Sequence, residues 1–246
     1  MKYLLFLTAS VVLFSQCKKV KPEDNDLNGR TKVTFNSALE YGTMVDIDGN
    51  EYKTITIGGQ TWMAENLRVT RYRNGEEIIL AENNAQWFES NTDGGLAICS
   101  NLFYTKDLDS IATFGRIYQG QVFMNGEIAP EGWRMPTEDD YQTLLTYLGP
   151  NAANKLKEAG LGNWNSTTTD VTNESGFTAI PGGARFDIEQ NFTGVSDYTR
   201  IWTVTPGPPV VGQATYKDIR IYYDQPEIEW GHTTQLSGAY VRLIKE

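Results

Sequence analysis

Histidine and cysteine are scarce in this chain of 246 residues, which has one histidine and two cysteines. Zinc sites built from several histidines or cysteines are therefore excluded. Basic residues are in the minority, with 21 lysines and arginines against 31 acidic residues and a formal net charge of −10. Nucleic-acid binding needs a basic patch, and no basic run occurs in the part of the chain that we expect to fold. We therefore expect no nucleic-acid partner.

The chain also lacks a hydrophobic run long enough to cross a membrane. Its most apolar stretch, residues 3–14 (YLLFLTASVVLF), follows the charged start Met1-Lys2. This stretch is shorter than the roughly 17 to 25 residues of a spanning helix. A short apolar run after a charged start is typical of a secretory signal peptide. We predict that residues 1–16 are such a signal and that no later segment spans a membrane.

The first cysteine follows this segment directly, in Phe14-Ser15-Gln16-Cys17. These residues resemble the lipobox at which bacterial lipoproteins are cleaved and acylated, although Gln16 replaces the usual small residue. The surrounding SQCKK resembles lipoproteins of the Bacteroidetes. The resemblance implies that Cys17 carries lipid and that this lipid is the membrane attachment. An ordinary signal peptide with a chance cysteine is the alternative.

Residues 17–39 are polar, with lysines followed by Glu23, Asp24 and Asp26. This composition predicts a flexible tether. The acidic residues resemble the signals that send Bacteroidetes lipoproteins to the outer face of the outer membrane. The resemblance implies an outer-membrane protein that faces the cell exterior.

Residues 40–246 show the patterns of short strands and two helices. Residues 46–57 (DIDGNEYKTITI) alternate in character, and Gly58-Gly59 then turns the chain into residues 61–63, which predicts a hairpin. Asp46, Asp48 and Asn50 are also spaced as in a calcium loop. Glu51 stands where that loop requires glycine, so we interpret the segment as a turn.

The clearest helix signal begins at Thr137, which can cap the first turn. Tyr141, Leu144 and Leu148 then fall on one face, and Gly149-Pro150 ends the helix. We predict a second helix from residue 151 to about residue 160. Strands are predicted at 176–179, 182–183, 201–203, 219–223 and 239–244. Helices in the middle of the chain with strands on either side indicate an α+β fold.

Four ordered stretches carry a family resemblance: residues 46–78, 130–149 (PEGWRMPTEDDYQTLLTYLG), 163–186 and 240–246 (YVRLIKE). They resemble the Fibrobacter succinogenes major paralogous domain over about residues 41–246. That family in turn resembles formylglycine-generating enzymes and, more distantly, the C-type lectin-like fold. The resemblance implies one lectin-like domain with short antiparallel strands, two helices and a loop-rich C-terminal half. It also implies that the two ends of the chain pair.

Two positions depart from the family pattern. Members usually have cysteine where this chain has Ala129 and again where it has Leu243. Because both are lost together, we predict that these two positions face each other within disulfide range and that an apolar contact replaces the bond.

Enzymatic activity would have to come from the formylglycine-generating resemblance, which implies copper held by a cysteine pair. That pair cannot form here, because Cys17 would be acylated and only Cys99 remains. We interpret Cys99 as a small core residue. The lone His232 lies in no catalytic motif. We therefore expect no enzymatic activity and no cofactor.

The segment before the last strand mixes aromatic rings with hydrogen-bond acceptors. Aromatic faces stack on sugar rings and acceptors bind hydroxyl groups, while tyrosine and tryptophan are also typical of protein-recognition surfaces. Gln225-Pro226-Glu227 resembles a calcium motif of C-type lectins, but its companion Trp-Asn-Asp is absent, so we predict no metal. The alternative is that the rings face the core while the charged groups are solvated. The predicted ligand-binding residues are Tyr223, Asp224, Gln225, Glu227, Glu229, Trp230 and His232.

The sequence thus predicts a lipid-anchored cell-surface protein whose lectin-like domain binds an extracellular glycan or protein. A structural surface or appendage subunit is the leading alternative. A formylglycine-generating-type oxidase is less favoured.

Overall fold

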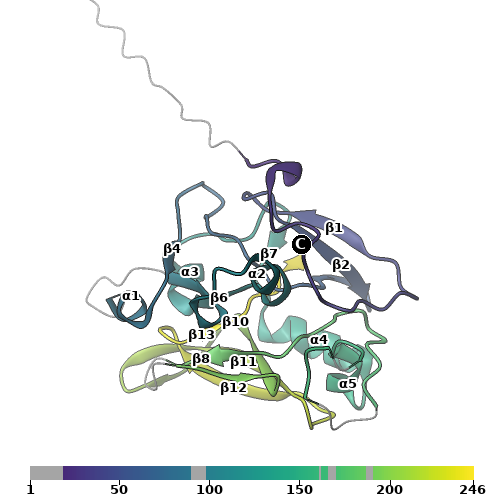
Figure 1. The fold of residues 1–246 in the computed structure, drawn as a ribbon. Coiled ribbons are helices and arrows are strands. Elements are labelled where there is room, and N and C mark those ends of the chain that lie inside the picture. Colours follow the sequence, from purple (N-terminus) through teal and green to yellow (C-terminus); the bar gives the residue numbers. More distant parts are fainter. Residues whose placement is uncertain (1–18, 90–97, 161, 166–169, 187–190) are drawn as a thin grey trace, which may run out of the picture.

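Two β-sheets and five α-helices occur in the part of the chain that the computed structural model describes, residues 19–89, 98–160, 162–165, 170–186 and 191–246. Figure 1 shows the sheets on either side of helix α4 (Glu138–Leu148). The structure thus confirms that helices and sheets are combined, as the sequence predicts.

The smaller sheet contains the two ends of the folded chain. Its five strands follow the order β1-β2-β3-β14-β7. In β14, Ile244 pairs antiparallel with Trp62 of β3 and with Arg134 of β7, which confirms that the end of the chain joins the first hairpin. The strands are β1 (Gly42–Val45), β2 (Glu51–Ile57), β3 (Gln60–Met63), β7 (Trp133–Arg134) and β14 (Ile244–Lys245).

The larger sheet has nine strands in the order β12-β11-β10-β8-β13-β6-β5-β4, with β9 paired to β8. The β4–β5 and β8–β10 pairs are parallel, so the sheet is mixed and not purely antiparallel. Its longest strands, β10 and β11, lie in the half expected to be rich in loops. The strands are β4 (Ile79–Ala81), β5 (Ile98–Asn101), β6 (Arg116–Gln119), β8 (Gly182–Arg185), β9 (Phe192–Val195), β10 (Tyr198–Val210), β11 (Gln213–Tyr222), β12 (Glu229–Thr234) and β13 (Gly238–Ala239).

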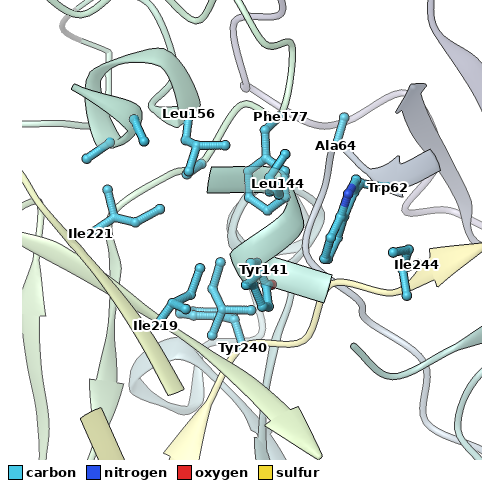
Figure 2. Close-up of a cluster of buried hydrophobic side chains, with 14 of the residues drawn as sticks. Trp62, Ala64, Tyr141, Leu144, Leu156, Phe177, Ile219, Ile221, Tyr240 and Ile244 are labelled. Atoms are coloured by element: carbon cyan, nitrogen blue, oxygen red, sulfur yellow. The ribbon is translucent and has the colours of Figure 1, made fainter. Parts of the chain in front are cut away.

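Helix α4 follows its sequence signals closely. Thr137 Oγ1 accepts from the Asp140 N–H at 3.2 Å, while Asp140 Oδ2 accepts from the Thr137 N–H at 2.7 Å, which forms a capping box. The helix ends at Leu148, before Gly149 with a φ of 67°. Figure 2 shows Tyr141 and Leu144 of this helix among Trp62, Phe177, Ile219 and Ile221, so its apolar face joins both sheets in one core.

The prediction of two helices is wrong, because four short helices accompany α4. They span less than two turns each, too short for apolar periodicity to reveal them. Helix α5 ends before residue 160, since Lys157 is extended and bridges Ala179. These helices are α1 (Asn84–Glu89), α2 (Leu108–Phe114), α3 (Gly120–Asn125) and α5 (Ala152–Leu156), and 3-10 turns occur at η1 (Pro22–Asp24) and η2 (Leu102–Tyr104).

The β2–β3 hairpin turns through Gly58 and Gly59, with φ angles of 57° and 88°, as the two glycines predict. In the preceding loop, the Asp46 carboxylate accepts from the backbone N–H groups of Asp48 and Asn50 and from the Tyr52 hydroxyl. These bonds confirm a turn in which the protein itself uses the carboxylate. Burial raises the pKa of Asp46, and its hydrogen bonds oppose that effect.

The described part of the expected tether, residues 19–39, is not free in the structure. We call this segment the strap, because it runs along the domain from the 46–50 turn to the core. Asn25 Nδ2 donates to the Asp48 carbonyl at 3.0 Å, and the Lys32 N–H donates to Thr113 Oγ1 at 2.9 Å. Farther along, Leu39 packs on the core. Asn25 and Asn28 of the strap thus bind backbone groups of the 46–50 turn, while the charged side chains of Glu23, Asp24 and Asp26 stay exposed.

Ala129 and Leu243 are both fully buried, and they belong to the same apolar cluster. This placement is consistent with the predicted contact, and their approach within disulfide range stays a prediction.

Candidate functional site

The first half of the predicted binding segment is attached to α5. Its backbone carbonyls at Tyr223 and Gln225 accept from Lys157 Nζ, at 3.2 and 2.7 Å. The side chain of Glu227 accepts from the Asn151 N–H at 2.7 Å, at the start of α5. The side chains of Asp224 and Gln225 are exposed. The segment is therefore held through its backbone and through Glu227.

Lys157 is fully buried at this attachment. Its third hydrogen bond goes to Asn154 Oδ1 at 3.2 Å, so each ammonium proton has an acceptor. Burial lowers the pKa of Lys157 from the ordinary 10.5 to about 8, and the charge of Asp224 opposes the decrease. Lys157 thus positions residues 223–225 and does not face a ligand.

The second half of the segment forms β12, an edge strand in which successive side chains alternate between faces. Trp230 is half-buried, and its ring lies 6.4 Å from that of Tyr141 on the face toward α4. Exposed His232 belongs to that same face, whereas Glu229 belongs to the other and lies 3.7 Å from Arg220. The predicted residues therefore do not converge on one site, and a ligand-binding role for them stays a prediction.

The two cysteines and the possible metal ligands provide no further candidate site among the described residues. Cys17 and the Cys99 side chain lie outside what the structure describes, and the backbone of Cys99 pairs with Tyr118 between β5 and β6. Among the described residues, no three His, Cys, Asp or Glu side chains come together as metal ligands. No described helix is both long and apolar enough to pass through a membrane.

A hollow that none of the predicted ligand-binding residues lines is formed between α4, α5 and the β2–β3 hairpin. We call it the Tyr147 hollow. Its volume is about 440 Å3, within the size range of small-molecule sites. It is lined by Leu39, Ile55, Thr56, Ile57, Tyr147, Leu148, Lys155, Glu174 and Ser175.

Tyr147 is the aromatic wall of this hollow. It is 66 % exposed, although its ring rests against Gly58 of the hairpin turn. A Cβ added to Gly58 would lie 2.6 Å from Tyr147 Cγ, so only glycine permits this contact. The turn therefore supports the ring and leaves most of its surface open to a ligand.

Lys155 and Glu174 form the polar wall. Lys155 Nζ lies 3.3 Å from the Glu174 carboxylate and donates to the Leu148 carbonyl at 2.6 Å, which fixes the ammonium. Glu174 is 56 % exposed in its side chain, so its remaining acceptor positions can bind hydroxyl groups. One signal for this site was present in the sequence: Tyr147 falls off the apolar face of α4.

A second hollow, about 460 Å3, lies beside α3 and has a different character. Phe123, Met124, Met135 and Val204 contribute apolar walls, and Met124 is 51 % exposed. Its one arginine, Arg134, is already engaged by Asp140 through two bonds of 2.6 and 2.8 Å. We call it the Met124 hollow, and its lining fits an apolar partner better than a sugar.

The comparisons with known proteins bear on the chain as a whole. A family model described as the Fibrobacter succinogenes major domain matches residues 55–245. No curated protein and no solved structure matches significantly. The matched span runs from within β2 to β14 and so contains the larger sheet, most of the smaller sheet without β1, and every described α-helix. The chain therefore belongs to the Fibrobacter succinogenes major domain family.

Proposed function

We propose that this protein is a glycan-binding lipoprotein of the outer-membrane surface, anchored through Cys17, whose lectin-like domain binds a saccharide in the Tyr147 hollow. The observation that carries the proposal is the exposed Tyr147 ring held opposite the Lys155–Glu174 pair.

This arrangement suits a sugar for a physical reason. The apolar face of a pyranose ring packs on an aromatic surface, and its hydroxyl groups need donors and acceptors at the sides. Tyr147 offers the surface, Glu174 offers acceptors, and Thr56 is an exposed hydroxyl on the hairpin side. Tyr147 belongs to α4, Thr56 to β2 and Lys155 to α5, and the ion pair with Lys155 holds Glu174, so the groups are positioned before the ligand arrives.

A protein ligand is the second candidate, and the exposed Met124 favours it. Methionine side chains adapt to apolar partners, and the Met124 hollow contains two of them. A structural surface or appendage subunit would use the same kind of contact.

A glycan array probed with the mature protein and its variants tests the proposal. We expect Tyr147→Ala to abolish the signal, because it removes the stacking surface. Phe103→Ala is the matched control, since Phe103 is 59 % exposed and lies outside the hollow. Binding that survives Tyr147→Ala, or the absence of binding to any glycan, would reject the Tyr147 site. Loss on Trp230→Ala alone would instead place the site on the 223–232 segment.

A further inference from the structure

The strap joins the domain very soon after the proposed lipid-bearing residue. The Val20 N–H donates to the Ile47 carbonyl at 3.2 Å. A Cβ added to Gly49 would lie 2.8 Å from the Val20 carbonyl oxygen, so the strap lies directly on the 46–50 turn. Farther along, Asn28 Nδ2 donates to the Gly49 carbonyl at 2.8 Å, and the Glu51 N–H donates back to Asn28 Oδ1 at 2.9 Å. The strap is thus attached from Val20 onward.

We propose that this attachment holds η1 and the 46–50 turn directly against the phospholipid headgroups of the membrane. The inference rests on the proposed acylation of Cys17. Two residues separate Cys17 from Val20, and the three steps from one Cα atom to the next reach at most about 11 Å when fully extended. A free tether over residues 17–39 would have a root-mean-square length of about 26 Å. The attached strap therefore removes most of the separation that a free tether would allow.

Electrostatic attraction to the lipids does not account for this contact between η1 and the headgroups. The exposed side chains near η1 have both signs, with Lys19 and Lys21 beside Glu23, Asp24 and Asp26. A surface of mixed sign gains little from anionic lipids, so chain length and not electrostatic attraction determines the position. We therefore expect the contact to be insensitive to salt.

The proposed seating also gives the domain an orientation. In Figure 1, η1 (purple) lies at one end of the molecule, and β11 and β12 lie at the other. With η1 at the headgroups, the open edge of β12 faces away from the membrane. The surface beyond β12 is then available to partners outside the cell.

Fluorescence quenching by nitroxide-labelled headgroups tests the seating on the acylated full-length mature protein in phosphatidylethanolamine vesicles. The background is Cys99→Ser, with a fluorophore on Asp24→Cys in η1 or on Val211→Cys, where the native valine is 96 % exposed at the β10–β11 tip. We expect several-fold stronger quenching at position 24 than at position 211. A flexible glycine-serine insert after Lys18 should abolish that difference, and added salt should not.

Each outcome has a separate meaning. Equal quenching at positions 24 and 211 on a protein whose mass includes the lipid would overturn the seating and leave the anchor intact. Strong quenching at position 24 that persists with the insert would show adsorption of the domain itself and would also overturn the inference. A mass without lipid would refute the anchor and, with it, the seating.

Discussion

The buried ammonium of Lys157 predicts a stability that rises with pH. The folded pKa of about 8 lies below the ordinary 10.5, so the unfolded chain binds more protons between these values. Unfolding therefore becomes less favourable as the pH rises through this window. The full increase in the free energy of unfolding is about 3.4 kcal/mol. Between pH values of about 7.5 and 9.5 the increase is about 2 kcal/mol.

Urea unfolding of wild type and Lys157→Met at those two pH values measures this contribution. The variant has no ammonium at the site, so we expect it to lose the rise of about 2 kcal/mol. Lys32→Met is the control, because it removes an exposed lysine and leaves Lys157 in place. Equal pH dependence in wild type and Lys157→Met would refute the argument that burial of this charge destabilises the folded state.

Three further variants test the fold. Arg242→Met leaves the carbonyls of Phe177 and Thr178 without their buried guanidinium donor, and urea unfolding should show a loss of at least about 3 kcal/mol. Gly49→Ala strains a residue with a φ of 76° and pushes on the strap at Val20, so trypsin should cut faster after Lys19, and an unchanged rate would contradict the close contact. The double variant Ala129→Cys/Leu243→Cys should form a disulfide worth roughly 3 to 5 kcal/mol, and two free thiols after oxidation would disprove their proximity.

The elements predicted correctly depend on residues close together in the chain. The capping box joins Thr137 to Asp140, and the hairpin turn needs only Gly58-Gly59. Such signals act locally, so the sequence contains them in full. A closing strand was predicted from the residues at 239–244, but its pairing with the first hairpin was expected only from the family resemblance.

The strap was not predictable, because its partners are distant in sequence. Asn25 and Asn28 have the composition of a solvated linker, and only the position of the 46–50 turn shows that their amides are bound. Likewise, the strand register places Glu229 and Trp230 on opposite faces of β12. A segment rich in aromatic and acidic residues therefore did not form one site.

The Tyr147 hollow depends both on a local sequence signal and on contacts between residues that are distant in sequence. The position of Tyr147 off the apolar face of α4 is visible in the sequence, but the opposing Lys155–Glu174 pair is assembled from a helix and a distant loop. The exposed ring of Tyr147 forms a candidate site because the hairpin turn, distant in sequence, lies against it.

Calorimetric titration of an array-positive saccharide into the mature protein tests the central claim most directly. The Tyr147 account predicts that Tyr147→Phe binds nearly as wild type, because the stacking face is kept, and that Tyr147→Ala binds at least about tenfold more weakly, or ~1.4 kcal/mol. Wild-type affinity in Tyr147→Ala would contradict it.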